Sequence, residues 1–510
     1  MRRVIGGLVC VSGYVLFKPL PLPDSQGPAY QELPKLPYAQ HPNRHFLSKM
    51  PRTVGIIGGG ISGLVTAKVL KQQGYAVQVL EKRDHIGGVW YDNYEGAGLQ
   101  APYHTYNMPD FTFPEGTPML PKQDVILQFL EQYIETFGLQ ETISLNTEVQ
   151  KMRQLSDDTW ELDLKDGSTK AYDFLVICNG TYNRPSLPSF PGQASFQGQI
   201  LHSSQFQHAR KLCTGKKVVV VGGGKSAMDM LEVASDYTTP VIGLMRTVHW
   251  TVPLSFTLFG LNPGYTMYSR IVSFLHTPEY AESAWVNWLL HPVGLLYWRF
   301  IGSYLVQDLP ISARPSVPLS SEYPHLDTRT SNYAYKLQQG QITIKQGSVD
   351  RFTPTGLVTV DGEVLPADVV ILATGFKRDF LGLKEEDGEQ WRYRGMVLPG
   401  VRNLAVVGYI ATVQTALITN LQAVWLSEVL RGHAVLPSNE AMLGDIKARQ
   451  DYNKGPGESK RGSLHFRVDF LAEQLLGDMH LQTRRAKTWL QHYFGRTGAT
   501  EYRSVVTHRV

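Results

Sequence analysis

A short apolar strand that leads directly into a glycine turn and a helix is the feature that most constrains this chain. Residues 53–57 read Thr-Val-Gly-Ile-Ile, and an aliphatic helix follows the turn. The G-x-G-x-x-G turn consists of Gly58, Gly60 and Gly63 at its three fixed positions. A second strand, residues 76–80, ends at Glu81, where an acid can accept ribose hydroxyls. Because such glycines and a helix amino terminus seat a pyrophosphate, this order predicts a dinucleotide-binding unit.

The same pattern occurs again in the middle of the chain. Lys217 and the four valines of residues 218–221 predict a strand, which leads into a G-x-G-x-x-A turn made of Gly222, Gly224 and Ala227. The next strand leads to Arg246, at the place where an NAD site carries an acid. A guanidinium there suits a 2′-phosphate, so NADPH is favoured over NADH. Lys225 in the turn either adds charge for a phosphate or is a solvated lysine on the helix face.

A short Gly-Gly turn follows Glu81. It comprises Gly87 and Gly88 and precedes Trp90. In proteins with two dinucleotides such a turn lies against the cofactor; an ordinary glycine turn with a core tryptophan is the other interpretation. Between Tyr91 and Pro121 the chain has no clear period, which predicts loops around the cofactor.

Composition argues against several functional classes. The net charge of +4 is small for 510 residues and no long basic run occurs, so nucleic acid is not the implied partner. The three cysteines show no C-x-x-C pair or metal-ligand spacing, so we expect no disulfide scaffold, metal site or dithiol redox centre. Cys178 lies within an apolar strand and is expected to be a core residue, not a nucleophile.

Two segments have more than one interpretation. Residues 1–17 place two arginines before an apolar run, as a signal peptide or short anchor does, but the proline-rich stretch to Pro42 indicates a linker. We favour translation from Met50. Residues 284–306 are strongly apolar and suit a substrate entry or a membrane-facing surface, or a buried helical pair broken at Pro292. We favour the buried pair, so membrane association is possible but not preferred.

From about Thr53 to Tyr502 the chain resembles the flavin-containing monooxygenases, a branch of the class B flavoprotein monooxygenases. Its segment Phe196-x-Gly198-x-x-x-His202-x-x-x-Phe206 is similar to the family's F-x-G-x-x-x-H-x-x-x-Y. Further similar motifs are Gly87-Gly-Val-Trp90, Asp110-Phe-Thr-Phe-Pro114, Arg246-Thr-Val-His-Trp250, Ala373-Thr-Gly375-Phe376 and Gln422-Ala-Val-Trp425.

The resemblance implies FAD and NADPH as cofactors and dioxygen as co-substrate. NADPH then delivers hydride to FAD, and the reduced flavin forms a peroxyflavin that oxygenates a small nitrogen or sulfur nucleophile or a carbonyl compound. Thr374 and Gly375 are implied in cofactor binding. The candidate catalytic residues are Gln100, which stands where the family often has asparagine, and His202, which we expect to shape the interface between the nucleotide domains. The alternative is that His202 has a purely structural role, with its ring nitrogens hydrogen-bonded.

The expected fold is α/β, with two Rossmann-like domains and the NADPH domain inserted in a split FAD domain. The expected bounds are 1–49 for a leader or proline-rich linker without fixed structure, 50–210 for the first part of the FAD domain, 211–325 for the NADPH domain with a helical insertion, 326–440 for the second part of the FAD domain, and 441–510 for a C-terminal helical tail. We expect residues 368–375 to form a strand that returns to the first domain, as residues 403–408 do.

Three other functions remain open at this point. An NADPH oxidase or reductase that produces hydrogen peroxide would use the same two sites. A Baeyer–Villiger enzyme usually has tryptophan and then proline or aspartate after the motif histidine, whereas this chain reads Phe206-Gln-His. A binding protein that has lost turnover is disfavoured by the intact turns with Glu81 and Arg246. We expect a cytoplasmic location, while the sequence specifies neither substrate nor oligomeric state.

Overall fold

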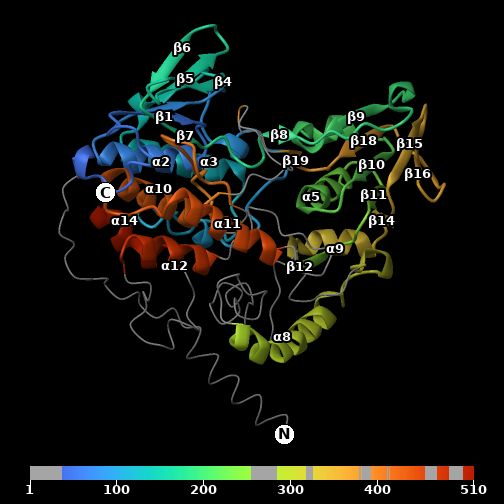
Figure 1. Ribbon diagram of the computed structural model, residues 1–510. Helices are drawn as coiled ribbons and strands as arrows, with labels where there is room; N and C mark the ends of the chain where they lie inside the picture. The colour runs from blue at the N-terminus through green and yellow to red at the C-terminus, as the bar shows by residue number, and fades with distance from the viewer. Residues whose placement is uncertain are drawn as a thin grey trace.

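Two five-stranded parallel sheets form the centre of the molecule (Figure 1). The computed structural model describes residues 37–253, 284–316, 326–377, 381, 392–410, 412, 414–453, 468–481 and 498–509. The predicted α/β class with two Rossmann-type units is confirmed by the parallel pairing within each sheet. The first expected strand and helix pair appears as β1 (Thr53–Ile57) and α2 (Ile61–Gln72), separated by the glycine turn.

The first sheet has the strand order β20-β7-β1-β2-β3. Its other strands are β2 (Ala76–Leu80), β3 (Ile143–Ser144), β7 (Phe174–Ile177) and β20 (Leu404–Val406). The helices α2, α3 (Gln123–Thr136) and α10 (Thr415–Arg431) lie against one face (Figure 1). An antiparallel sheet of β4 (Val149–Gln154), β5 (Trp160–Leu164) and β6 (Thr169–Tyr172) covers the other face, where Trp160 and Leu162 share a core with Leu175. Near-continuous apolar runs such as β7 are typical of parallel strands buried on both faces.

The second sheet has the strand order β14-β11-β10-β18-β9. These strands are β9 (Gln199–His202), β10 (Val218–Val221), β11 (Val241–Met245), β14 (Ile342–Gln346) and β18 (Val369–Leu372). One face packs on α4 (Ala209–Cys213), α5 (Lys225–Ala234) and α9 (Ser331–Gln338). The other face is covered by the antiparallel strands β15 (Val349–Thr353), β16 (Gly356–Thr359) and β17 (Val364–Pro366).

The strand at residues 368–375 does not return to the first domain, so that expectation is wrong. Strand β18 instead pairs in parallel with β10 on one side and with β9 on the other. An apolar strand buried on both faces suits the centre of either sheet, and nothing in its composition selects one of them. Strand β20 does rejoin the first sheet beside β7, so a second unit inserted into a split first unit is confirmed.

Two chain crossings connect the sheets, and they pair with each other. After β7 the chain passes through β8 (Arg184–Pro185) before it reaches β9, and after β18 it passes through β19 (Phe376–Lys377) on its way back. Strands β8 and β19 are antiparallel neighbours between the two sheets (Figure 1). We call this pair of strands the hinge ribbon. Each of its strands belongs to one of the two crossings that link the units covalently.

The expectation that residues 1–49 lack fixed structure is wrong for residues 37–49, whereas residues 1–36 lie outside the described residues. The N-terminal strap (residues 37–52) crosses the end of α10, and its Asn43 is completely buried. The Asn43 amide donates to the carbonyls of Val429 and Ala434 at 2.9 and 2.8 Å and accepts from the Leu436 N–H at 2.8 Å. Translation from Met50 would remove these contacts.

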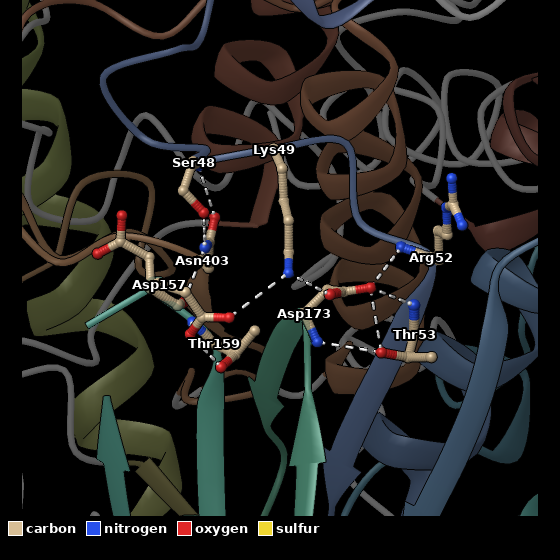
Figure 2. Close-up of polar contacts among 9 residues, drawn as sticks. Ser48, Lys49, Arg52, Thr53, Asp157, Thr159, Asp173 and Asn403 are labelled. Atoms are coloured by element: carbon tan, nitrogen blue, oxygen red, sulfur yellow. Dashed lines mark hydrogen bonds and ion pairs between the residues drawn. The ribbon is translucent and has the colours of Figure 1, made fainter. Parts of the chain in front are cut away.

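Ion pairs and backbone bonds fasten the end of the strap next to β1 (Figure 2). Lys49 reaches Asp173 at 2.8 Å, and the Asp173 carboxylate accepts from the N–H groups of Arg52 and Thr53. Burial alone would raise the pKa of Asp173, but Lys49 and these N–H groups lower it below its ordinary value. Ser48 is joined to Asn403, just before β20. The strap thus contacts both parts of the split first unit, through Asp173 in the first part and Asn403 in the second.

The apolar stretch at residues 284–306 is one helix, α8 (Ala284–Leu305), which continues through Pro292. The favoured buried helical pair is therefore wrong. Trp298 is buried, but Leu296 and Phe300 are 71% and 50% exposed. Among the described residues, no helix is both long enough and apolar enough to cross a membrane.

The remaining elements are short or lie near the C-terminus. They are η1 (Tyr38–Gln40), η2 (Gly88–Trp90), η3 (Tyr103–Thr105), η4 (Gln140–Thr142), η5 (Gln193–Ser195), η6 (Ser203–Gln205), β12 (Trp250–Pro253), η7 (Ile311–Ala313), β13 (Leu326–Arg329), α11 (Asn439–Asn453), α12 (Val468–Asp478), η8 (Ala499–Tyr502) and α14 (Arg503–Arg509). Where it is described, the C-terminal region contains α11, α12 and α14.

Candidate functional site

The first glycine turn lies between β1 and α2, at the carboxyl edge of the first sheet. Gly60 caps α2, whose first N–H groups have no partner within the helix. A Cβ on Gly63 would stand 1.9 Å from the Gly58 carbonyl oxygen, so only glycine allows the helix to approach the strand this closely. A Cβ on Gly60 would meet its nearest neighbour only at 3.7 Å. The turn therefore leaves room for a pyrophosphate in front of free N–H groups. We call this turn, Gly58–Gly63 at the start of α2, the first cradle.

Glu81 follows β2 directly and lies beside this turn. Its side chain is buried, and one carboxylate oxygen accepts from the Gly59 N–H at 2.6 Å. The other oxygen accepts from the Arg83 N–H at 3.0 Å. A carboxylate has about four acceptor positions, so Glu81 retains capacity for hydroxyl donors while its orientation is fixed.

The Gly87–Trp90 turn lies against the first glycine turn. The Gly87 N–H donates to the Gly59 carbonyl at 3.0 Å, and a Cβ on Gly88 would come 3.1 Å from the Gly60 Cα. The Trp90 indole donates to the Tyr106 hydroxyl at 2.7 Å. The position of this turn agrees with the interpretation that it lies at a cofactor site. Trp90 itself packs against the apolar core of the first unit.

The second glycine turn has the same arrangement between β10 and α5. Gly222 has a φ of +144°, and a Cβ there would lie 2.2 Å from the Ala373 carbonyl oxygen. Gly224 caps α5 with no atom within 4 Å of where a Cβ would stand, and Ala227 is completely buried against the strand. Arg246 lies just beyond β11 and is exposed at the same edge. This turn, Gly222–Ala227 at the start of α5, is called the second cradle and also fits a dinucleotide.

Lys225 matches neither of the two interpretations based on its sequence position. Its ammonium group pairs with Asp229, one turn further along α5, and its side chain is only 15% exposed. Burial raises the pKa of Asp229, while Lys225 and the Tyr94 hydroxyl lower it. Lys225 is thus held by a partner in the same helix rather than solvated.

His202 is buried at the end of β9 and fastens the hinge ribbon. Its Nε2 donates to the Gly375 carbonyl at 2.9 Å, so Nδ1 is the acceptor for the Ser204 N–H at 3.1 Å. Gly375 also accepts from the Ser186 N–H, and the Thr374 hydroxyl donates to the Ser186 carbonyl at 2.6 Å. Burial lowers the pKa of His202, opposed by the bond to Gly375. This is a neutral, fully bonded histidine.

Gln100 is an exposed residue in a loop that is fixed on both sides. The Leu99 N–H donates to the Pro121 carbonyl at 3.1 Å, and the Tyr103 N–H donates to the Met119 carbonyl at 2.9 Å. Gln100 belongs to a surface loop and His202 to the buried hinge, so the two candidate catalytic residues occupy different environments.

The Asp110–Pro114 motif packs against this loop, because Phe113 contacts Tyr103 edge-on at 5.9 Å between ring centroids. Asp110 forms a buried ion pair with Lys68 of α2, and Phe113 stacks on Phe129 of α3 at 3.9 Å between ring centroids. Burial lowers the pKa of Lys68, opposed by Asp110. The motif therefore ties the loop to the helix that begins at the first cradle.

Gln422 has a positional role that the sequence motif did not reveal. It is completely buried in α10, and its Oε1 accepts from the Gly408 N–H at 3.0 Å. A Cβ on Gly408 would lie 1.9 Å from the Ser62 hydroxyl oxygen in the first turn of α2. Gln422 thus holds the segment after β20 against the first cradle. In the sequence, Gln422 stood out only as part of the Gln422-Ala-Val-Trp425 motif, and nothing in that motif indicated a hydrogen bond to Gly408.

The two described cysteines, Cys178 and Cys213, are buried thiols. Burial raises the pKa of Cys178 to about 12 and that of Cys213 to about 11, which keeps both thiols protonated. Within the described part of the chain, no group of histidine, cysteine, aspartate and glutamate side chains is arranged to hold a metal ion.

Comparison with known proteins identifies the family. The chain matches the model of the family described as "Flavin-binding monooxygenase-like" over residues 51–474. It is 29% identical to the probable flavin-containing monooxygenase 1 of Arabidopsis thaliana, an alignment that covers 88% of this chain and 96% of the relative.

Solved structures show the same fold. The S-allyl-L-cysteine S-oxygenase of Allium sativum superposes with a TM-score of 0.59 at 18% identity, covering 90% of this chain and 94% of that one. An oxidized steroid monooxygenase bound to NADP superposes with a TM-score of 0.62 at 17% identity, covering 84% of this chain and 97% of that one. The family match extends over most of the chain and both cradles. The chain belongs to the flavin-binding monooxygenase-like family and is a flavin monooxygenase.

Proposed function

We propose that this enzyme binds FAD in the first cradle and NADPH in the second, and inserts one atom of dioxygen into a small nitrogen or sulfur nucleophile or a carbonyl compound. The observation that carries the proposal is the pair of glycine cradles, each at the carboxyl edge of its own parallel sheet and joined by the hinge ribbon. Ligands of open α/β sheets bind at this edge. The family membership supports the flavin and the reaction type.

The residues of each cradle have distinct roles in this proposal. The N–H groups at the start of α2 bind the FAD pyrophosphate and Glu81 accepts from its ribose. The N–H groups at the start of α5 bind the NADPH pyrophosphate. Arg246 is exposed beside that cradle and pairs with the 2′-phosphate, since a guanidinium forms two parallel bonds to such a group.

Flavin supplies the redox chemistry, because reduced flavin can activate dioxygen. The protein binds, orients and keeps water away. Gln100 offers an amide donor and acceptor from a loop fixed on both sides, and we assign it the contact with substrate and activated oxygen. We assign His202 a positioning role, since both of its ring nitrogens are engaged in the hinge. We also propose a cytoplasmic location, which cell fractionation would test.

The reaction is tested with ¹⁸O₂. Purified enzyme is supplied with NADPH, dioxygen and a panel of tertiary amines, sulfides and ketones, and the products are analysed by mass. We expect one labelled oxygen atom per product and substrate-dependent NADPH use. If NADPH consumption yields only hydrogen peroxide with every compound, the protein is instead an NADPH oxidase.

The cofactor preference is tested at Arg246. Arg246→Ala should raise the KM for NADPH by about 10- to 100-fold, as expected for loss of a charged hydrogen bond, while the KM for NADH changes little. Arg351→Ala is the matched control, because Arg351 is an exposed arginine on β15, in the sheet that covers the other face. Equal effects of Arg246→Ala on both nucleotides would refute the assignment of the 2′-phosphate.

A further inference from the structure

The loop that follows the Gly87–Trp90 turn leaves the first unit and attaches to the second. The Glu95 N–H donates to the Phe206 carbonyl at 2.9 Å, and the Glu95 carboxylate accepts from the Ala209 N–H at 2.7 Å. Tyr94 packs against the core of the second sheet. A Cβ on Gly96 would lie 2.7 Å from a methyl group of Val233 on α5. The loop is thus fastened to the helix of the second cradle.

A buried carboxylate forms the polar centre of this attachment. The Tyr94 hydroxyl donates to Asp229 Oδ2 at 2.8 Å, and Lys225 pairs with Asp229 Oδ1. Asp229 is only 8% exposed, so both of its oxygens are bound away from solvent. Lys225 is the first residue of α5, directly after the capping glycine of the second cradle. We call Tyr94, Asp229 and Lys225 the interdomain clamp.

The other end of the same loop rests on the first cradle. Gly87 is bonded to Gly59, and Gly88 lies against Gly60. Tyr94 comes only six residues after Gly88 and six before Gln100. One short loop therefore contacts the glycine turn of the first cradle and the helix α5 of the second, and it also carries the candidate substrate residue. Apart from the hinge ribbon, it is a second direct connection between the two cradles.

We propose that Tyr94 and Asp229 are positioning residues for hydride transfer, because the interdomain clamp fixes the second cradle relative to the first. This inference rests on the proposed function. In the step concerned, the C4–H bond of the nicotinamide breaks, its hydride carries two electrons to the flavin, and NADPH becomes NADP⁺. Neither clamp residue touches the reacting atoms. The clamp sets how closely and at what angle the two rings meet, and a misplacement of about 1 Å can cost up to roughly a hundredfold in rate.

The test uses Tyr94→Phe, which removes one hydroxyl and keeps the packing. Anaerobic stopped-flow reduction of the flavin by NADPH should become roughly tenfold slower, with an NADP⁺ Kd changed by no more than about twofold. Asp229→Asn keeps an acceptor for Tyr94 but loses the charge that holds Lys225, and it should also slow reduction. Tyr91→Phe is the matched control, because Tyr91 is an exposed tyrosine of the same loop, and it should reduce at the normal rate.

A second measurement is independent of turnover. Hydrogen exchange of the ligand-free protein reports the amides of Glu95 and Ala209, which the docked loop protects. Tyr94→Phe should speed exchange in residues 91–98 and 206–213, and Tyr91→Phe should not. Normal reduction together with normal exchange in Tyr94→Phe would overturn the clamp. Failure of NADPH to reduce even the unaltered protein would instead overturn the proposed function, while the exchange result would still decide whether the clamp docks the loop.

Discussion

At the scale of single residues, the cradles depend on glycines, which have no side chain, and the hinge ribbon depends on the uncharged imidazole of His202. Gly63 and Gly222 each allow a backbone approach that a single methyl group would block. His202 satisfies a carbonyl with one ring nitrogen and an N–H with the other. A second proton on His202 would place two donors face to face at Nδ1. The hinge therefore requires the uncharged imidazole.

This requirement predicts a pH dependence of stability. The pKa of His202 is lowered in the folded protein, so as the pH falls below about 6.5 the unfolded chain takes up the proton first. The contribution of His202 to the free energy of unfolding is complete above that pH and is lost as the pH falls toward the folded-state pKa. The loss is at most about 1.4 kcal/mol per pH unit.

Urea unfolding of the wild type and His202→Gln between pH 8 and pH 5 measures this contribution. The wild type should be the more stable at pH 8, and its advantage should shrink toward pH 5. His41, whose pKa burial also lowers, titrates in both proteins and cancels in the difference. An advantage that grows in acid would show that His202 is protonated in the folded state.

At the scale of elements, the N-terminal strap is the part that was not anticipated. Its anchors are the buried Asn43, Phe46 and Leu47, which contact the end of α10 and the start of β20. These contacts join residues nearly 400 positions apart, and a proline-rich composition contains no sign of them. The glycine turns and Glu81, by contrast, were predictable because each depends on residues within about thirty positions in the chain.

A chain that begins at Met50 should therefore be much less stable than one that begins at residue 37. Burial of Phe46 and Leu47 contributes about 1.5–3 kcal/mol each, against a total of about 5–15 kcal/mol for a typical domain. Asn43→Ala, which leaves three buried backbone groups without their partner, should cost about 2–4 kcal/mol. Thermal unfolding and flavin content measure both effects. Equal melting temperatures for the two truncated chains would refute a structural role for the strap.

At the scale of the whole molecule, sheet membership could be predicted only in part. The central strands of both sheets are apolar, and the sequence correctly indicated two parallel-sheet units with one inserted in the other. It could not assign β18, because a run such as Val-Val-Ile-Leu satisfies the centre of either sheet. The interdomain clamp was missed for a related reason, since Tyr94 and Asp229 lie in different units and carry no local motif.

The second unit should fold alone only if it includes all five strands. The expected domain of residues 211–325 lacks β9, β14 and β18, which would expose both edges of the β10–β11 pair and the apolar faces that pack on Val219 and Val220. A fragment of residues 186–375 contains the whole sheet and both of its covering layers. We expect it to unfold cooperatively and to bind NADP⁺, and we expect the 211–325 fragment to do neither. Circular dichroism melts and NADP⁺ titration of both fragments test this prediction. Cooperative folding of the 211–325 fragment would show that these residues form a domain on their own and that β18 is not needed for its stability.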